Sequence, residues 1–385
     1  MASRSSSAAS THPSDNRTAR LILNALPNIG PISCRRMLAH CHDSPAAIFL
    51  LSRQQLLAIK GIGPAIADTL LNWRSFFNPS AEEEKMAQRN LRFVTPEDGE
   101  AYPPLLRETY DPPLGLYVAG NFRWHDRTIA IVGSRRTTPY GRAMARSLAA
   151  GLAAAGWCVV SGLARGIDTA AHQGALDAGG ATTAVLGCGP DIVYPPENLD
   201  LLRAITEQGA VFSEFPLGRS ADKQTFPMRN RIVAGMSRAT LVIESDLNGG
   251  SMITARMAAD QNRLVCALPG RADHATSRGC HALIREGATL VTSVEEILEE
   301  LGEAPAAQGE LPLGPVGTRP ELSAAEENLW QHFTDGSAHS PDTLADRTAL
   351  PVANLMATLL ALELKNLLIK NSSGRYEAAP RTVRQ

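Results

Sequence analysis

The sequence predicts an α/β protein with a doubly wound, mainly parallel sheet, preceded along the chain by a helical domain and followed by a small domain of helices and a hairpin. Between residues 127 and 301, short apolar runs alternate with helical patterns. The runs are apolar at nearly every position, which is typical of parallel strands with helices on both faces. Right-handed crossovers between such strands give an extended Rossmann-like fold, which binds ligands at the carboxyl ends of its strands.

The expected strands and helices alternate along this region. Strands are expected at Ile129–Val132, Cys158–Ser161, Thr183–Leu186, Ala210–Ser213, Leu241–Glu244, Leu264–Leu268 and Thr289–Val291. Helices are expected at Gly141–Ala155, Thr169–Ala178, Asn198–Gln208, Asn230–Met236, Ser251–Gln261 and Cys280–Arg285. The loops at the carboxyl edge of the sheet are therefore Gly133–Arg136, Gly162–Gly166, Gly187–Pro190 and Ser245–Ser251.

Composition divides the 385-residue chain into parts that serve as candidate domains. Residues 1–17 are rich in Ser, Ala and Thr and are expected to be a disordered tail. Residues 18–77 are expected to form a helical domain, and residues 91–301 the sheet domain with its proline-rich lead-in. Residues 302–320 have the composition of a flexible linker, and residues 321–378 are expected to form a last small domain.

Overall charge and cysteine usage narrow the class of protein. The formal net charge is −2, so the whole chain argues neither for nor against a nucleic-acid partner. The six cysteines show no CxxC spacing, which is typical of a reducing compartment, and Cys34, His40, Cys41 and His42 lack a second ligand pair for a metal. No apolar run approaches the length of a membrane span, so we expect a cytoplasmic protein without a membrane partner.

Two of the loops have the composition of phosphate sites. Gly133-Ser134-Arg135 follows one strand, and Ser161-Gly162 to Arg165-Gly166 follows the next. From Arg127 to Ile167 there are six arginines and no acidic residue. Free backbone N–H groups, a helix N-terminus and a fixed positive charge together favour an anion. Gly162 and Gly166 also fit a purely structural role in tight turns, and Asp168 fits a helix N-cap.

Two further segments bring candidate anion-binding groups to the same edge. In Phe226-Pro-Met-Arg-Asn-Arg231 a proline precedes a helix that carries Arg229 and Arg231. In Asn248-Gly-Gly-Ser251, Gly250 and the serine are expected at a helix N-terminus, with Ser251 as its cap. Phe226 and Tyr140 are candidates for base stacking, although each also fits a core position.

The motifs of common nucleotide-dependent enzymes are absent from the sequence. Gly133 is not followed by the GxGxxG pattern of dinucleotide-binding proteins, and no GxxxxGK[ST] or GxSxG motif occurs. We therefore expect no catalytic residues, no metal ligands and no cofactor.

The ordered motifs of the middle region resemble those of the DprA/Smf family of bacterial DNA processing proteins. The motifs are IAIVGSRRTTPYG, SGLARGIDTAAHQGAL, VLGCGPDIVYPPEN, SEFPLG, FPMRNRIVAGMS, ESDLNGGSMITARMA and LPGRADHATSRGCHALIREGA, and Tyr102-Pro with Asp111-Pro-Pro precedes them. The resemblance implies a single-stranded-DNA-binding recombination mediator of natural transformation (competence). Such a protein protects incoming single strands, loads the RecA recombinase onto them and helps to displace single-strand-binding protein, without catalytic turnover.

The resemblance also implies a site and an assembly. The nucleic-acid-binding pocket would be built from Gly133, Ser134, Arg135, Ser161, Gly162, Arg165, Gly166, Arg229, Arg231, Gly250 and Ser251. The protein would be a homodimer formed through about residues 265–292.

The flanking domains carry patterns of their own. Ile59-Lys-Gly-Ile-Gly-Pro-Ala-Ile-Ala67 matches a helix–hairpin–helix in a SAM-like domain, which could contact DNA phosphates or serve only for packing. Leu26-Pro-Asn-Ile-Gly-Pro31 is a degenerate second copy, with Asn28 where glycine is preferred. Residues 324–377 have the order of a winged helix, but its third helix, Val352–Leu364, contains no Lys or Arg. We therefore expect this domain to be a protein-interaction or packing module rather than a reader of DNA.

The alternative function is a nucleotide-processing enzyme that hydrolyses nucleoside monophosphates on a related scaffold. Such an enzyme is expected to show PGGxGTxxE, but the corresponding segment here runs Gly249-Gly-Ser-Met-Ile-Thr-Ala-Arg256. Arg256 stands near the position where a carboxylate is needed, which argues against hydrolysis.

Overall fold

The structure is a computed structural model that divides into two compact units, Met1–Ala304 and Pro305–Gln385. It describes residues 12–13, 15–120, 124, 127–303, 322–333, 337–348, 350–365, 367–370 and 374–378. Most of the expected tail (1–17) and of the expected linker (302–320) lies outside the described residues.

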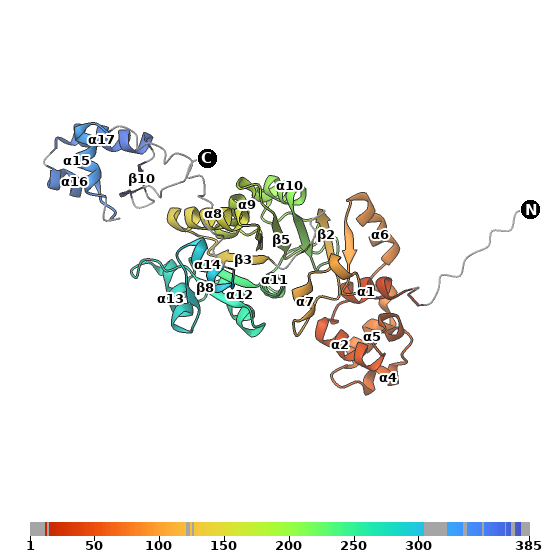
Figure 1. Cartoon of the computed structure of the whole chain (residues 1–385). Helices are drawn as coiled ribbons and strands as arrows, with labels where there is room; N and C mark the ends of the chain where they lie inside the picture. The colour runs from red at the N-terminus through yellow and green to blue at the C-terminus, as the bar shows by residue number, and fades with distance from the viewer. Residues whose placement is uncertain are drawn as a thin grey trace, which may run out of the picture. The chain divides into compact units, whose positions relative to one another are not determined.

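A nine-stranded sheet forms the centre of the first unit (Figure 1), with the strand order β1-β2-β6-β5-β4-β3-β7-β8-β9. The seven strands from β6 to β9 in this order are parallel, which confirms the doubly wound, mainly parallel fold. They are β3 (Thr128–Gly133), β4 (Cys158–Ser161), β5 (Thr182–Leu186), β6 (Ala210–Ser213), β7 (Ala239–Ile243), β8 (Leu264–Ala267) and β9 (Thr289–Leu290). Each lies within two residues of its expected bounds.

Two strands lie in the proline-rich lead-in, where none was expected. β1 (Arg92–Val94) pairs antiparallel with β2 (Leu116–Gly120), and β2 pairs antiparallel with β6. The lead-in is thus part of the sheet. The η2 turn (Gly99–Ala101) and α7 (Pro104–Arg107) lie between these two strands.

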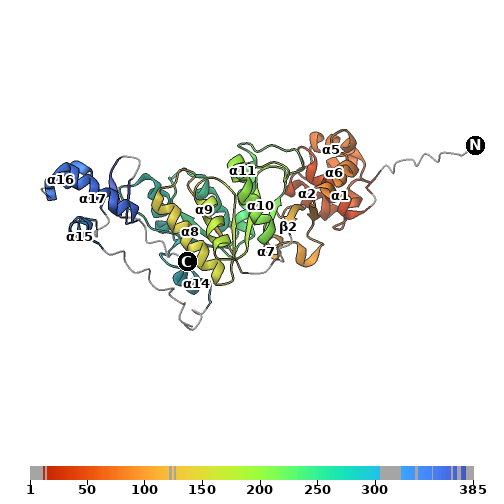
Figure 2. The ribbon, with the colours of Figure 1, turned by 90° about the horizontal axis from the view of Figure 1, so that it is seen from above.

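The sheet is covered on both faces because its strands are apolar at successive positions. Along β3, Ile129 and Ile131 pack in a core with helices α8, α9 and α14. Ala130 and Val132 point the other way and pack with helices α11, α12 and α13. Helices α8 and α9 lie side by side over their face (Figures 1 and 2).

The helices of the sheet begin at local start signals. Thr138 accepts a hydrogen bond from the Gly141 N–H (3.1 Å) and Pro139 follows it, so the helix α8 begins there. The helix α11 begins at Thr225, before the expected Asn230, because Pro227 fits within a first turn. The helices are α8 (Pro139–Ala154), α9 (Ile167–Asp177), α10 (Leu199–Gln208), α11 (Thr225–Gly235), α12 (Gly250–Asp260), α13 (Arg278–Arg285) and α14 (Val294–Glu300), with 3-10 turns η3 (Pro196–Asn198) and η4 (Ala275–Ser277).

The N-terminal helices have their own core within the first unit. Two hairpins connect helices in the same way: Asn28 and Gly61 have positive φ values of 63° and 82°, and Gly30 and Gly63 precede the next helices. Asparagine tolerates this conformation better than most residues, which explains how the degenerate copy forms. The helices are α1 (Asn16–Ala25), α2 (Pro31–His40), α3 (Pro45–Ile48), α4 (Arg53–Ala58), α5 (Pro64–Leu71) and α6 (Pro79–Gln88), with the turn η1 (Trp73–Ser75).

The second unit is a winged helix with its own buried core. It contains α15 (Ala324–Gln331), α16 (Pro341–Thr348), α17 (Val352–Leu364) and an antiparallel hairpin of β10 (Leu368–Lys370) and β11 (Tyr376–Ala378). Among the described helices, none is long and apolar enough by itself to cross a membrane. The bent pair α16 and α17 meets that test only when the two are taken together.

Candidate nucleic-acid interface

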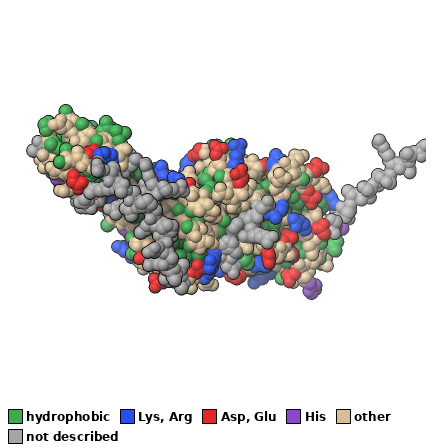
Figure 3. Space-filling view, turned by 45° about the horizontal axis from the view of Figure 1, so that its top comes forward, with side chains coloured by type: hydrophobic (Ala, Val, Ile, Leu, Met, Phe, Trp, Pro, Cys, Tyr) green, Lys and Arg blue, Asp and Glu red, His purple; other side chains and the backbone are tan. Residues whose placement is uncertain are grey.

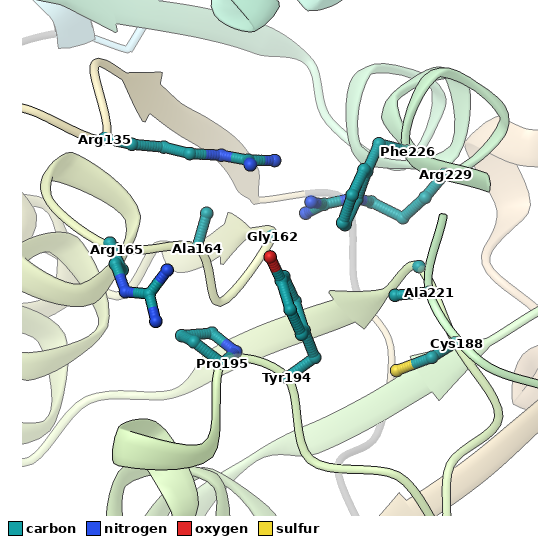
Figure 4. A pocket seen from close by; sticks show the side chains of 11 residues that line it. Arg135, Gly162, Ala164, Arg165, Cys188, Tyr194, Pro195, Ala221, Phe226 and Arg229 are labelled. Carbon is teal, nitrogen blue, oxygen red and sulfur yellow. The ribbon is translucent and has the colours of Figure 1, made fainter. Parts of the chain in front are cut away.

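A pocket lies at the carboxyl edge of the sheet, where the sequence predicts ligand binding (Figure 4). We call it the arginine pocket. Its lining comes from the loops after β3, β4 and β5, from the loop before α11, and from the first turns of α11. The lining residues are Arg135, Gly162, Ala164, Arg165, Gly187, Cys188, Tyr194, Pro195, Ala221, Phe226 and Arg229. The pocket thus brings together four of the predicted site residues: Arg135, Gly162, Arg165 and Arg229.

Arg135 is held by the backbone of the loop in which it lies. The Ser134 N–H donates to the Glu244 carbonyl (2.7 Å), and the Ser134 carbonyl accepts from the Ile167 N–H (3.2 Å). The Glu244 carboxylate accepts hydrogen bonds from the Thr137 hydroxyl (2.7 Å) and the Thr138 N–H (2.8 Å). These contacts fix the loop on both sides of Arg135, whose exposed guanidinium lies 4.8 Å from the centre of the Phe226 ring.

Arg229 is the most unusual side chain of the pocket. The residue is 5% exposed, and its Nε has no hydrogen-bond partner in the described part of the chain. Burial lowers the pKa of this guanidinium, Asp168 opposes the shift, and Arg135 adds to it. Figure 4 shows the two guanidinium groups pointing toward each other across the pocket. A buried cation facing a second cation favours an anion between them.

Gly162 leaves room for this arrangement. A Cβ at position 162 would lie 1.1 Å from Nη1 of Arg229, so any side chain there would displace the guanidinium. The sequence was compatible with two roles for this glycine, a tight turn and a phosphate-binding loop. In the structure, the missing side chain of Gly162 leaves space for the Arg229 guanidinium in the wall of the pocket.

Asp168 has a different role from the expected helix N-cap. Gly166, with φ of 82°, is the N-cap of α9. The Asp168 carboxylate, within the first turn, instead accepts hydrogen bonds from the N–H groups of Gly162 (3.1 Å) and Ala164 (3.3 Å). Burial raises the pKa of Asp168, and Arg229 and these N–H groups oppose the shift. Two backbone donors that were expected to face a phosphate are therefore already bonded.

Arg165 and two aromatic rings complete the pocket. Arg165 forms an exposed ion pair with Glu197 (Nη2 to Oε2, 3.1 Å). Tyr194, which is 38% exposed, and Phe226 have ring centroids 5.6 Å apart and tilted by 42°. Phe226 was predicted as a candidate for base stacking, whereas Tyr194 was not predicted. The Tyr194-Pro-Pro-Glu-Asn segment carries no pattern that would have placed the ring in this pocket.

The other predicted site residues lie outside the pocket and have structural contacts. The Ser161 hydroxyl donates to the Ile131 carbonyl (2.6 Å), and the Ser251 hydroxyl bonds Ser245 (2.8 Å) rather than capping α12. A Cβ at Gly133 or Gly166 would meet a backbone oxygen at 1.9 or 2.3 Å. The residues placed outside the pocket lining are Gly133, Ser134, Ser161, Gly166, Arg231, Gly250 and Ser251.

Arg231 lies in α11 like Arg229 but faces away from the pocket. Its guanidinium pairs with the buried Glu214 carboxylate (2.5 Å) and with Asp111 (3.4 Å), and it donates to the Asp111 carbonyl (3.0 Å). Because its charge is neutralised internally, it is not available to a phosphate in this arrangement.

Among the described residues, the lining of the arginine pocket contains one thiol and no cluster of metal ligands. Within the described part of the chain, no group of three or more His, Cys, Asp or Glu side chains is placed to hold a metal ion. Cys188 lines the pocket, but burial raises the pKa of its thiol to about 11, which keeps it protonated at neutral pH.

Comparison with known proteins identifies the family. Residues 92–302 match the family model described as DNA recombination-mediator protein A, and residues 315–370 match the DprA winged helix domain. The chain belongs to the DprA/Smf family. Protein Smf of Synechocystis sp. is 32% identical over 93% of this chain and 97% of that protein. Protein Smf of Escherichia coli is 40% identical over 70% of this chain and 73% of its own length.

A solved structure of the DprA/Smf family has the same fold. DNA processing protein A of Streptococcus pneumoniae superposes with a TM-score of 0.64 at 33% identity, covering 74% of this chain and 97% of that one. The arginine pocket lies in the region that the family model matches. This position makes the arginine pocket the candidate functional site of the chain.

Proposed function

We propose that this protein binds single-stranded DNA through the arginine pocket and acts as a recombination mediator of natural transformation. The observation that carries the proposal is the buried Arg229 guanidinium, which faces Arg135 and forms no direct ion pair among the described residues. The Asp168 carboxylate acts on it electrostatically but already accepts hydrogen bonds from the Gly162 and Ala164 N–H groups. A phosphodiester between the two arginines would supply the negative charge that the pocket lacks. Hydrogen bonds from guanidinium groups to phosphate are charge-assisted and short.

The aromatic rings favour single strands over duplex. Tyr194 and Phe226 lie next to the arginines in the same pocket. Bases stack on such rings only when they are not stacked within a duplex, and the contact tolerates any sequence. A pocket that combines guanidinium groups with aromatic faces therefore suits an unpaired, sequence-independent strand.

The mediator role extends this binding to protein partners. We propose that the protein protects incoming single strands, displaces single-strand-binding protein and loads RecA. We also propose that it is a dimer through residues 265–292. Membership of the DprA/Smf family supports these steps.

A RecA ATPase assay on oligonucleotides coated with single-strand-binding protein tests the loading step. Adding this protein should shorten the lag, and an unchanged lag would contradict RecA loading.

We propose further that binding occurs without catalysis. The pocket lining contains no histidine or carboxylate, and its one thiol is held protonated. Hydrolysis of nucleoside monophosphates remains the competing outcome, and incubation with each monophosphate followed by chromatography of the products tests it. Release of a free base would contradict the non-enzymatic role.

Binding is tested by fluorescence anisotropy with labelled oligo-dT and the matched variants Arg135→Ala and Arg136→Ala. Both side chains are exposed arginines in one loop, but only Arg135 lines the pocket. Arg135→Ala should weaken binding by about 1–3 kcal/mol, as expected for a charge-assisted phosphate contact. Arg136→Ala should bind nearly as well as the native protein. Equal losses in the two variants would contradict a specific pocket, and duplex that competes as well as oligo-dT would contradict a single-strand site.

A further inference from the structure

The outward face of helix α17, in the winged-helix unit, is apolar along its whole length. Val352, Met356, Leu360 and Leu364 are 65%, 40%, 55% and 74% exposed. Residues four positions apart lie on one side of a helix, so these four form a continuous ridge. We call them the α17 ridge. Figure 3 shows hydrophobic side chains on the visible surface of this unit.

The opposite face of α17 already supplies the core of the unit. Leu355, Leu359 and Leu362 are fully buried, together with residues of α15 and α16. A surface helix of a soluble domain normally has polar residues on its outer side, and a helix that is apolar all round is normally covered. The α17 ridge therefore has the composition of an interface.

DNA does not fit this face. In a winged helix the third helix reads base edges and phosphates with basic and amide side chains. Helix α17 has no Lys or Arg, and its one charged residue is Glu363 in the last turn. A helix whose one charged side chain is acidic offers no cation to a phosphate backbone.

We propose that the α17 ridge pairs with the α17 ridge of a second copy of this chain, in an antiparallel arrangement about a two-fold axis. Ridges of residues spaced by four pack into the equivalent grooves of an identical helix. Ala353 and Ala357 lie beside the ridge, are exposed and are small enough to allow close approach. A two-fold axis makes the same patch complementary to itself.

The charge on the helix favours the antiparallel orientation. Pro351, the N-cap of α17, provides no side-chain cap, so the first N–H groups of the helix keep their partial positive charge. In the antiparallel pair, Glu363 of each copy approaches this end of the other helix, where a carboxylate is stabilised. A parallel pair would instead place the two Glu363 carboxylates together.

The size of the ridge indicates a weak contact that depends on tethering. A ridge of four side chains covers a few hundred Å², whereas a stable interface takes roughly 800 Å² from each partner. In the full chain a second contact elsewhere would raise the effective concentration of the two winged helices. The α17 contact is separate from the arginine pocket and from residues 265–292, so each can fail without the others.

The experiment measures self-association of the full-length chain by sedimentation equilibrium. Leu360→Glu places a charge in the ridge, and Asn354→Glu places the same charge on an exposed position of α17 outside the ridge. Leu360→Glu should weaken self-association at least about tenfold, because a buried unpaired charge opposes the contact. Asn354→Glu should leave it unchanged. Equal behaviour of the two variants would overturn the proposal.

Cross-linking identifies the occupant directly. All six native cysteines are buried, so a cysteine introduced on the surface is the accessible thiol. Leu360→Cys treated with a short bis-maleimide should give covalent dimers, and Asn354→Cys should give few. Absence of covalent dimers from Leu360→Cys would overturn the proposal, whether the ridge is covered by the rest of the same chain or by another protein.

A third variant separates this contact from the proposed sheet dimer. Leu290→Glu changes an exposed position of β9, within residues 265–292. If Leu290→Glu abolishes the dimer and Leu360→Glu has no effect, the α17 contact is wrong and the sheet dimer stands. If only Leu360→Glu has an effect, the α17 contact stands and the proposed sheet dimer is wrong.

Discussion

Arg229 and Asp168 together determine how the arginine pocket recognises an anion. The Asp168 carboxylate occupies the N–H groups of Gly162 and Ala164, so these donors are not free for a phosphate. Loops that cradle phosphates commonly use such backbone donors. Here the guanidinium groups of Arg135 and Arg229, together with that of Arg165 in its exposed pair with Glu197, are the charged donors of the pocket lining. Recognition by side chains tolerates variation in the position of a phosphate, which suits a flexible strand.

His172, a fully buried residue of α9, should make the stability of the fold depend on pH. Burial, assisted by Arg229, lowers the pKa of its imidazole from 6.5 to about 3. The Thr182 hydroxyl donates its proton to the Val159 carbonyl (2.7 Å), so the hydroxyl oxygen accepts from Nδ1 of His172 (2.7 Å). Nε2 of His172 has no hydrogen-bond partner among the residues that the structure describes. The folded protein therefore holds this imidazole neutral.

The sign of the effect follows from proton binding. Between pH 6.5 and about 3 the unfolded chain binds a proton at His172 that the folded chain does not. The free energy of unfolding therefore falls as the pH is lowered through this range. When the pH is lowered from 7.5 to 5.0, the free energy of unfolding of the native protein should fall by about 2 kcal/mol more than that of the variant His172→Asn. Urea unfolding at both pH values measures this difference, and parallel losses in the two proteins would show that His172 is not held neutral.

The contacts of helix α11 show what the sequence alone could and could not predict. Alternating apolar runs predicted the seven parallel strands and the edge where the pocket lies. They did not predict β1 and β2, because strands of three and five residues in a proline-rich segment are too short to show a clear period. The position of these strands depends on their pairing with each other and of β2 with β6. Arg229 and Arg231 are equivalent in the motif, but two residues along a helix is about 200°. Which of them faces the pocket depends on Glu214 and Asp111, which come from other elements.

Arg231 connects several elements of the first unit, so its loss should affect stability rather than DNA binding. It joins α11 to Glu214 at the end of β6 and to Asp111 before β2. Arg231→Gln leaves the Glu214 carboxylate buried without its partner. This should lower the free energy of unfolding by about 3–5 kcal/mol in urea titrations.

A matched control is Arg203→Gln, which removes an exposed ion pair with Asp200 and should lower the free energy of unfolding by less than about 1 kcal/mol.

Burial raises the pKa of Glu214 while Arg231 opposes the shift. Without Arg231 the Glu214 carboxyl should therefore take up a proton more readily. The stability lost in Arg231→Gln should be smaller at acidic pH for this reason. Native stability combined with lost DNA binding in Arg231→Gln would place this residue in the interface instead.

At the scale of the whole molecule, charge distribution determines how DNA binding responds to salt. The net charge is −2, so long-range attraction to DNA is weak and affinity depends on the few cations of the pocket. Each phosphate neutralised on a single strand contributes about −0.7 to the slope of log K against log salt. If the pocket neutralises three phosphates through Arg135, Arg165 and Arg229, the slope of log K against log salt should be about −2 with a short oligo-dT. Fluorescence anisotropy at salt concentrations from about 0.05 to 0.3 M measures this slope. Arg135→Ala should reduce the magnitude of the slope by about 0.7 while Arg136→Ala preserves it. A slope as steep as about −5 would mean that cations outside the arginine pocket make most of the phosphate contacts.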